Sequence, residues 1–233
     1  MKKIVIISII IMYVLLMAGF LYFQFVNVRV ADWMKFCTIV LSFLTIAFLW
    51  KDSFCRYDGT MVLSAMFIIV IADIISIFHH RSNEVIFVVM YIVIMTILFM
   101  RYNYKKWNNA LILPLFLIIP ITMYFLPLQD WIPLFPESQR TLIVVTFFYI
   151  QVLISVIVFA SIRVKQGRFP KINAVLIITG LIIFCFGDIC VALANLELPR
   201  EYRSMQIFFN RSIWVFYTPS KALLAFSAFN YSK

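Results

Sequence analysis

The chain has 233 residues, of which 64% are hydrophobic and only 13% are charged. Soluble domains have roughly half apolar and a quarter charged residues, so this composition excludes a soluble globular protein and indicates an integral membrane protein. The formal net charge of +10 does not indicate a nucleic-acid partner, because such binding needs a basic face on a water-exposed domain. We expect a single membrane-embedded helical domain over residues 1–233.

Apolar runs long enough to cross a bilayer recur along the whole sequence. A spanning helix needs about 20 residues, and hydrocarbon leaves only helices or closed barrels as spanning structures. The runs are too long for barrel strands. The first one resembles a signal peptide but lacks a small-x-small cleavage site, so we expect it to stay as a span. The sequence predicts an all-α transmembrane bundle of eight spans: Ile4–Phe23, Trp33–Trp50, Thr60–Phe78, Val85–Met100, Ala110–Leu126, Thr141–Ile162, Ile172–Ala194 and Ser212–Phe229.

The orientation follows from the basic residues in alternate connections. With eight spans, twelve Lys and Arg residues fall on the side that holds both termini and six on the other side. Because cytoplasmic connections carry the excess of basic residues, we expect both termini in the cytoplasm.

The two halves of the sequence show a weak internal likeness. Asp73 in IADIISIF and Asp188 in FGDICVAL each fall in the third helix of a four-helix half. Parallel repeats of this kind occur in membrane folds. We therefore expect a 4+4 parallel pseudo-repeat, with chance similarity between two short apolar segments as the alternative.

Four ionisable residues fall within predicted spans, namely Lys35, Asp73, Asp188 and Lys221. Each would cost roughly 2.5 to 3.5 kcal/mol at a span centre on insertion scales, which makes them the leading candidates for a functional site. Both aspartates and Lys35 lie toward the outer ends of their spans, so we expect a polar pocket open to the extracytoplasmic leaflet. In the alternative, the aspartates form buried ion pairs with the lysines and hold helices together, and Lys35 snorkels to the interface.

Histidines and cysteines do not form a recognisable metal site. His79 and His80 follow the third span, where solvated loop residues are a better interpretation than phosphate ligands. The cysteines contain no CxxC pair, so we expect packing residues and neither a disulfide framework nor a zinc site. We expect no metal and no cofactor.

At these residues the sequence resembles the YhhN-like membrane proteins, whose characterised members are lysoplasmalogenases. That family has eight spans, with Lys-Pro near the start of the second, Gly-Asp in the third, Ser-Asp in the seventh and a Tyr-Tyr-x-Ala-Gln-x-Leu-Ile-Ala-x-Ser-like eighth. The counterparts here are Lys35 in MKFCTIVL, Asp73 in IADIISIF, Asp188 in FCFGDICVAL and the run FYTPSKALLAFS. Tyr149 fits a tyrosine of the family's sixth span.

The sequence also departs from the family pattern. Phe36 replaces the proline, Ala72 replaces the glycine before Asp73, and Gly187 stands where the family usually has serine. Lys221 takes the glutamine position. The fourth span lacks the family's usual histidine and has only Tyr91 as a polar ring in its middle. These departures indicate a divergent member of the fold.

The resemblance implies cleavage of the vinyl ether of a lysoplasmalogen, which gives a fatty aldehyde and a glycerophospho-alcohol. Vinyl ethers hydrolyse by protonation at carbon, and water then captures the oxocarbenium ion. Two neighbouring buried carboxyl groups have pKa values that are pushed apart, so one can hold a proton while the other stays ionised. We expect Asp73 and Asp188 to be catalytic. One is the general acid and the other stabilises the cation or activates water, and the sequence does not assign which is which. The residues expected to bind substrate are Lys35, Tyr217, Lys221 and Tyr149.

Two other classes of function stay open. A noncatalytic lipid-binding relative is consistent with the missing histidine and the altered glutamine. A transporter of an ion or small solute would use the same intramembrane Asp and Lys residues, although five glycines are few for broken helices. The expected partner is a membrane lipid or lysophospholipid, and the expected location, through the resemblance, is a bacterial inner membrane.

Overall fold

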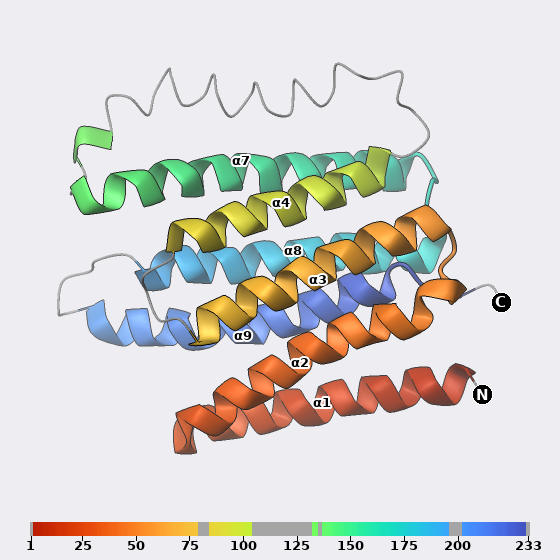
Figure 1. The fold of residues 1–233 in the computed structure, drawn as a ribbon, viewed down its shortest axis with the longest axis horizontal. Helices are drawn as coiled ribbons and strands as arrows, with labels where there is room; N and C mark the ends of the chain where they lie inside the picture. Colours follow the sequence, from red (N-terminus) through yellow and green to blue (C-terminus); the bar gives the residue numbers. More distant parts are fainter. Residues whose placement is uncertain (1, 79–83, 104–131, 135–136, 196–201, 232–233) are drawn as a thin grey trace. The chain divides into compact units, whose positions relative to one another are not determined.

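The computed structural model describes residues 2–78, 84–103, 132–134, 137–195 and 202–231 (Figure 1). Within these residues the protein is helical, with no strand and with seven α-helices. Six of them are long and apolar enough to cross a membrane, so the chain is an integral membrane protein. The α-helices are α1 (Lys2–Val26), α2 (Val28–Leu49), α3 (Arg56–Phe78), α4 (Glu84–Asn103), α7 (Glu137–Lys165), α8 (Lys171–Asn195) and α9 (Arg203–Phe226).

Seven of the eight predicted spans coincide with these helices. The remaining one, Ala110–Leu126, lies outside the described residues. The predicted eighth span, Ser212–Phe229, overlaps α9, which ends at Phe226 and is not among the six helices of membrane length and apolarity. Its first turns contain polar and charged residues such as Gln206 and Arg211. The described residues therefore establish six candidate spans and leave the count of eight as a proposal.

Two helices begin earlier than the predicted spans that they overlap. The second helix begins at Val28 rather than Trp33, because the extended backbone of Asn27 ends α1 and its side-chain oxygen accepts a hydrogen bond from the N–H of Val30 at 3.4 Å. Helix α9 begins at Arg203 rather than Ser212. In both cases charged residues were assigned to a connection, whereas backbone hydrogen bonds let a helix continue past the apolar segment.

The described helices form two compact units. The terminal unit comprises Met1–Gly59 and Phe169–Lys233, and the central unit comprises Thr60–Arg168. Each unit has its own packing and is treated separately below. The units do not follow the division into two sequence halves, because the first two helices pack with the last two.

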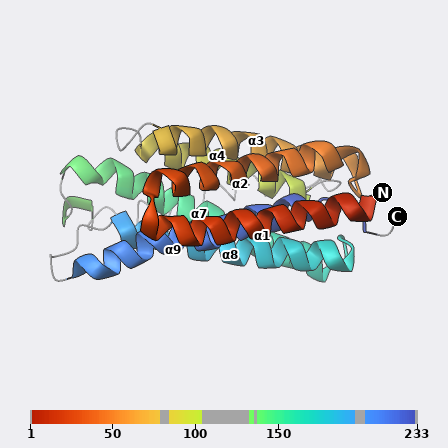
Figure 2. The same ribbon diagram turned by 90° about the horizontal axis from the view of Figure 1, so that it is seen from below.

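In the terminal unit, α8 runs along α9, α1 runs along α2, and α2 also contacts α9 (Figures 1 and 2). The start of α1 and the end of α9 lie at the same end of this unit, where Tyr13, Leu49, Phe226 and Phe229 form a buried cluster. The hydroxyl of Tyr13 in α1 donates to Ser42 Oγ in α2 at 2.8 Å, and both groups are buried. Polar as well as apolar contacts therefore join these helices.

The chain after α9 is fixed at that end of the terminal unit. Asn173 of α8 is fully buried, and its side-chain nitrogen donates to the carbonyl oxygens of Ser227 and Phe229 at 2.8 and 2.7 Å. Burial raises the pKa of Tyr231 to about 12. Its phenol therefore stays protonated at neutral pH and donates to the carbonyl of Phe226 at 3.1 Å.

In the central unit, α4 packs along α7. The rings of Phe99 and Phe159 meet edge to face, with centroids 4.9 Å apart. Helix α7 ends in a left-handed turn at Gly167, whose φ is 67°. The N–H groups of Gly167 and Arg168 donate to the carbonyls of Val164 and Arg163. Glycine avoids the Cβ clash that this turn would otherwise impose.

Candidate functional site

The predicted aspartate of α8 contacts a tyrosine of α9. The hydroxyl of Tyr217 donates to Asp188 Oδ1 at 3.2 Å. One turn before Asp188, the ring of Phe184 stacks on the Tyr217 ring with centroids 5.1 Å apart. Gly187 lets the two helices approach, because a Cβ at that position would lie 2.7 Å from Cδ2 of Tyr217. Within this short segment of α8, Phe184 stacks on the Tyr217 ring, Gly187 leaves room for it, and Asp188 accepts its hydrogen bond.

A buried ammonium group also lies beside this tyrosine. Lys221 is only 1% exposed, and its Nζ lies 4.2 Å from the centroid of the Tyr217 ring and 5.6 Å from that of Trp214. A cation over an aromatic face is attracted by the ring quadrupole, by about 2 kcal/mol or more when desolvated. Residues 214, 217 and 221 follow one another at helical spacing, so α9 presents all three side chains to the same region.

Lys35 of α2 joins the same cluster. Its Nζ lies 5.1 Å from the centroid of the Trp214 ring and 5.6 Å from that of Phe20 in α1. It also forms an ion pair of 2.7 Å with Asp32, one turn earlier in α2. Lys35 therefore lies well within a helix and has a carboxylate partner on that helix.

We call this set the Trp214 cluster; its members are Asp32, Lys35, Asp188, Trp214, Tyr217 and Lys221. It combines two carboxylates, two ammonium groups and a phenol within the terminal unit, in surroundings made largely of aromatic rings. Lys221 is buried, whereas the other charged members of the cluster are only partly buried, so charges at the Lys221 end of the cluster act more strongly than in solution. The cluster can orient a polar ligand, bind an anionic group or move a proton through the phenol and carboxylate.

The central unit contains a second tyrosine–aspartate pair. Asp73 of α3 is 2% exposed and accepts a hydrogen bond of 3.2 Å from the hydroxyl of Tyr91 in α4. Tyr149 of α7 meets the Tyr91 ring edge to face, with centroids 6.2 Å apart. Tyr149 therefore lies against the phenol that contacts the carboxylate. In both units, the tyrosine comes from the described helix that follows the aspartate's helix along the chain.

The structure divides the six predicted site residues between the two units. Lys35, Asp188, Tyr217 and Lys221 come together in the terminal unit, while Asp73 and Tyr149 belong to the central unit. His79 and His80 lie outside the described residues. Within the described parts of the chain, no group of three or more His, Cys, Asp and Glu side chains is arranged to hold a metal ion, and the four cysteines are free thiols.

Two members of the cluster were missed by the sequence reasoning. Trp214 shares the helical spacing of Tyr217 and Lys221, and that spacing was the available signal. Asp32 precedes Lys35 by three residues, a spacing that forms ion pairs on helices, but it was assigned to a connection.

Comparison of the sequence with protein-family models gives no match. Neither a search of curated proteins nor a search of solved structures finds a significant match to the chain.

Proposed function

We propose that the protein is a membrane hydrolase similar to lysoplasmalogenases, which cleaves the vinyl ether of lysoplasmalogen-type lysophospholipids. The observation that carries the proposal is the Trp214 cluster. There, Asp188 accepts the Tyr217 hydrogen bond at 3.2 Å, and the Lys221 ammonium lies 4.2 Å from the same ring. A carboxyl group can deliver a proton, and the neighbouring ammonium groups suit the phosphate of a lysophospholipid.

The reaction needs water and no redox partner. A proton adds to the vinyl carbon that is not bonded to oxygen, and the remaining carbon and oxygen share the positive charge of an oxocarbenium ion. Water adds to the charged carbon and loses a proton to a base. The hemiacetal then breaks its bond to the glycerol oxygen, which gives the fatty aldehyde and the glycerophospho-alcohol. A carboxylic acid supplies the first proton, and a carboxylate stabilises the cation and accepts the proton of water.

The proposal gives each remaining residue a part in this reaction. Tyr217 positions Asp188 through its hydrogen bond, while Lys221 and Lys35 favour the anionic phosphate end of the substrate. Asp73 is the second catalytic candidate, positioned by Tyr91, and Tyr149 supports that phenol. Each aspartate has its own tyrosine donor. Asp188 and Asp73 are therefore substituted separately, to test each tyrosine–aspartate pair on its own.

The decisive experiment measures aldehyde release from a lysoplasmalogen by the purified protein in detergent. We expect release by the parent chain and a loss of at least about 100-fold in Asp188→Asn, since general acid–base groups contribute about 10²- to 10⁴-fold. Asp73→Asn tells whether the central pair is also required. Glu137→Gln, which removes an exposed carboxylate at the start of α7, is the matched control. Absence of release from a folded parent, across several head groups, contradicts the hydrolase proposal.

A noncatalytic lipid-binding protein is the second candidate. It is favoured by the burial of the cluster, since Tyr217 is 3% exposed and Lys221 is 1% exposed, and by the ion pair that Lys35 already forms with Asp32. In that case the lysophospholipid binds to the parent without release of aldehyde, and Asp188→Asn leaves binding unchanged. Flux of an ion or solute through vesicles that contain the protein would instead support the transporter.

We further propose eight spans, as the family resemblance implies, together with a parallel pseudo-repeat and both termini in the cytoplasm of a bacterial inner membrane. Three observations support this arrangement. The basic residues are distributed unequally between alternate connections. The start of α1 and the end of α9 share one end of the terminal unit. Each unit contains a tyrosine–aspartate pair of the same hydrogen-bond length.

A further inference from the structure

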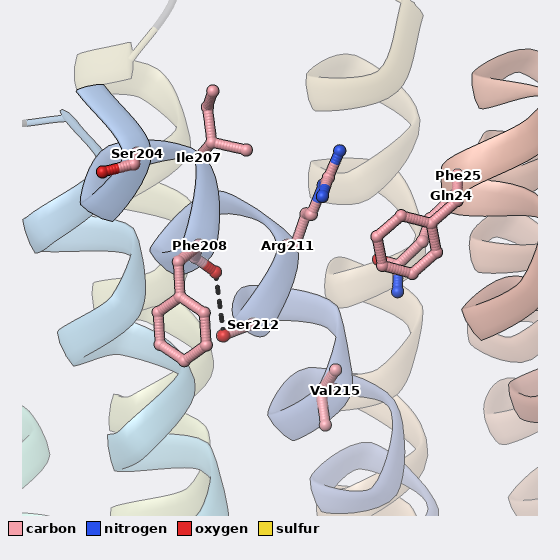
Figure 3. Close-up of a pocket in the computed structure, with 8 residues that line it drawn as sticks. All are labelled: Gln24, Phe25, Ser204, Ile207, Phe208, Arg211, Ser212 and Val215. Atoms are coloured by element: carbon pink, nitrogen blue, oxygen red, sulfur yellow. Dashed lines mark hydrogen bonds between the residues drawn. The ribbon is translucent and has the colours of Figure 1, made fainter.

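The terminal unit has a cavity of about 310 Å³ between the end of α1 and the first half of α9. Its lining does not include any member of the Trp214 cluster. The polar lining comes from Gln24, Ser204, Arg211 and Ser212, and the apolar lining comes from Phe25, Ile207, Phe208 and Val215 (Figure 3). The cavity therefore combines a cation and hydrogen-bonding groups with apolar walls.

The Arg211 side chain lines this cavity and lies against Phe25. Figure 3 shows its side chain extending from α9 toward Gln24 and Phe25 of α1. The guanidinium carbon lies 4.6 Å from the centroid of the Phe25 ring. An arginine stacked in this way keeps the N–H groups at its edge for a bidentate contact with phosphate. Within the described residues, Arg211 has no ion-pair partner, so the positive charge is left for a ligand.

Gln24 supplies the second polar group. Its Oε1 is buried and has no hydrogen-bond partner within the described residues. Leaving a buried acceptor without a partner is unfavourable, so a ligand with a hydroxyl or ammonium donor would be stabilised there. Ser212 donates to the carbonyl of Phe208 at 2.9 Å and can still accept a hydrogen bond. A phosphate ester with a donor-bearing head group matches this combination.

The depth of the cavity agrees with a lipid ligand. Gln24 and Phe25 lie at the end of the candidate span Ile4–Val26, where head groups begin. Phe25 and Phe208 are 66% and 65% exposed, so they offer apolar surface for acyl chains beside the cavity. Tyr22 and Trp33 are also exposed nearby along α1 and α2, as is typical of an aromatic belt at a membrane interface.

We propose that this cavity binds the head group of a diacyl phospholipid, with the phosphate on Arg211, a head-group donor on Gln24 and the acyl chains against Phe25 and Phe208. The lipid is a bound membrane component and not the substrate of the proposed hydrolase. The site is independent of the Trp214 cluster, so either proposal can fail without the other.

The test measures the binding of dioleoyl phosphatidylglycerol to the full-length protein, delipidated in a nonionic detergent, by native mass spectrometry and by titration with a fluorescent analogue. Dioleoylglycerol, dioleoyl phosphatidic acid and inorganic phosphate are compared under the same conditions. We expect phosphatidylglycerol to bind most tightly, because it alone combines the phosphate, the donor hydroxyls and the acyl chains. Equal binding of dioleoylglycerol, or equally effective competition by inorganic phosphate, would overturn the lipid proposal.

Substitutions identify the contacts. We expect Arg211→Gln to weaken phosphatidylglycerol binding by about tenfold or more, since charge-assisted hydrogen bonds are worth about 1.5 to 3 kcal/mol. Gln24→Leu should remove the preference for phosphatidylglycerol over phosphatidic acid. Arg203→Gln, a change of the same charge in α9 at a residue that does not line the cavity, should have no effect. If Arg211→Gln does not fold, the test rests on the lipid preference of the parent and of Gln24→Leu. An unchanged preference for phosphatidylglycerol over phosphatidic acid in Gln24→Leu contradicts the proposed site.

Discussion

Gly187 controls whether Tyr217 can reach Asp188. Adding a Cβ there would bring it within 2.7 Å of Cδ2 and 3.3 Å of Cε2 of the Tyr217 ring. That ring cannot turn away freely, because Phe184 stacks on its face and Lys221 lies over it. The absence of a side chain at Gly187 is therefore a structural requirement of this α8–α9 contact.

We predict that Gly187→Ala displaces the Tyr217 ring and lowers stability by about 1 to 3 kcal/mol, the usual cost of overpacking. Any aldehyde release should fall in parallel, since the hydrogen bond to Asp188 is lost. The measurement is the thermal midpoint in detergent together with the activity. Gly180→Ala is the matched control in the same helix. Its Cβ would lie 3.2 Å or more from the Leu224 side chain, so we expect a smaller change. An equal effect of the two substitutions would contradict the special role of position 187.

The aromatic members of the Trp214 cluster show what the sequence could and could not predict about single residues. Lys35, Asp188 and Lys221 stand out because each is a charge in an apolar segment. Trp214 does not stand out, since an aromatic ring in an apolar helix is ordinary. Its role depends on how α2 meets α9, and the periodicity of one helix carries no information about that crossing.

At the scale of elements, the α1–α2 pair is fastened by a buried hydrogen bond. Tyr13 of α1 donates to Ser42 of α2 at 2.8 Å. We predict that Tyr13→Phe and Ser42→Ala each destabilise the protein, and that the double variant costs about 1 kcal/mol less than the sum, which is the usual net value of a hydrogen bond. The measurement is a double-mutant cycle of unfolding free energies in mixed micelles. Strict additivity would mean that the bond contributes nothing.

The start of α8 holds the chain that follows α9. Asn173 donates to two carbonyl oxygens, those of Ser227 and Phe229. We predict that Asn173→Ala lowers stability by about 1 to 3 kcal/mol, because two buried acceptors lose their donor. It should also speed proteolysis after α9. Asn195→Ala is the control, since the Asn195 side chain is exposed and donates to the carbonyl of Val191 in its own helix. Equal protease sensitivity of the two variants would contradict the anchoring role of Asn173.

The helices themselves were largely predictable, and their ends were not. Apolar length alone located all seven described helices, because a spanning segment must satisfy its own backbone. Helices α2 and α9 begin before the predicted spans, and they include Arg29, Asp32 and Arg203, which were assigned to connections. A charged residue is unfavourable in the hydrocarbon interior of the membrane. The same residue is compatible with the part of a helix that extends beyond the hydrocarbon. The capping residue Asn27 was the local signal for the true start of α2.

At the scale of the whole molecule, the two compact units were not predictable from the sequence pattern. Residues 1–59 belong with residues 169–233, and that association is made by contacts between segments far apart in the chain. Hydrophobic periodicity describes one helix at a time. The sequence therefore predicted the helical class of fold and singled out Lys35, Asp188 and Lys221 as candidates, while the grouping of Lys35 with Lys221, and of Asp73 with Tyr91, required the structure.

The arrangement of α9 decides between an even and an odd number of spans. If α9 crosses the bilayer, the chain before Arg203 and the chain after Phe226 lie on opposite sides of the membrane. We predict that alkaline phosphatase is active when fused after Asn195 and inactive when fused after Lys233, because the second site would be cytoplasmic. A fluorescent protein that folds only in the cytoplasm should give the reverse pattern at the two sites. Equal reporter activity at both sites would mean that α9 lies along the membrane surface. The polar residues of its first turns would then face water, and the eight-span topology would be wrong.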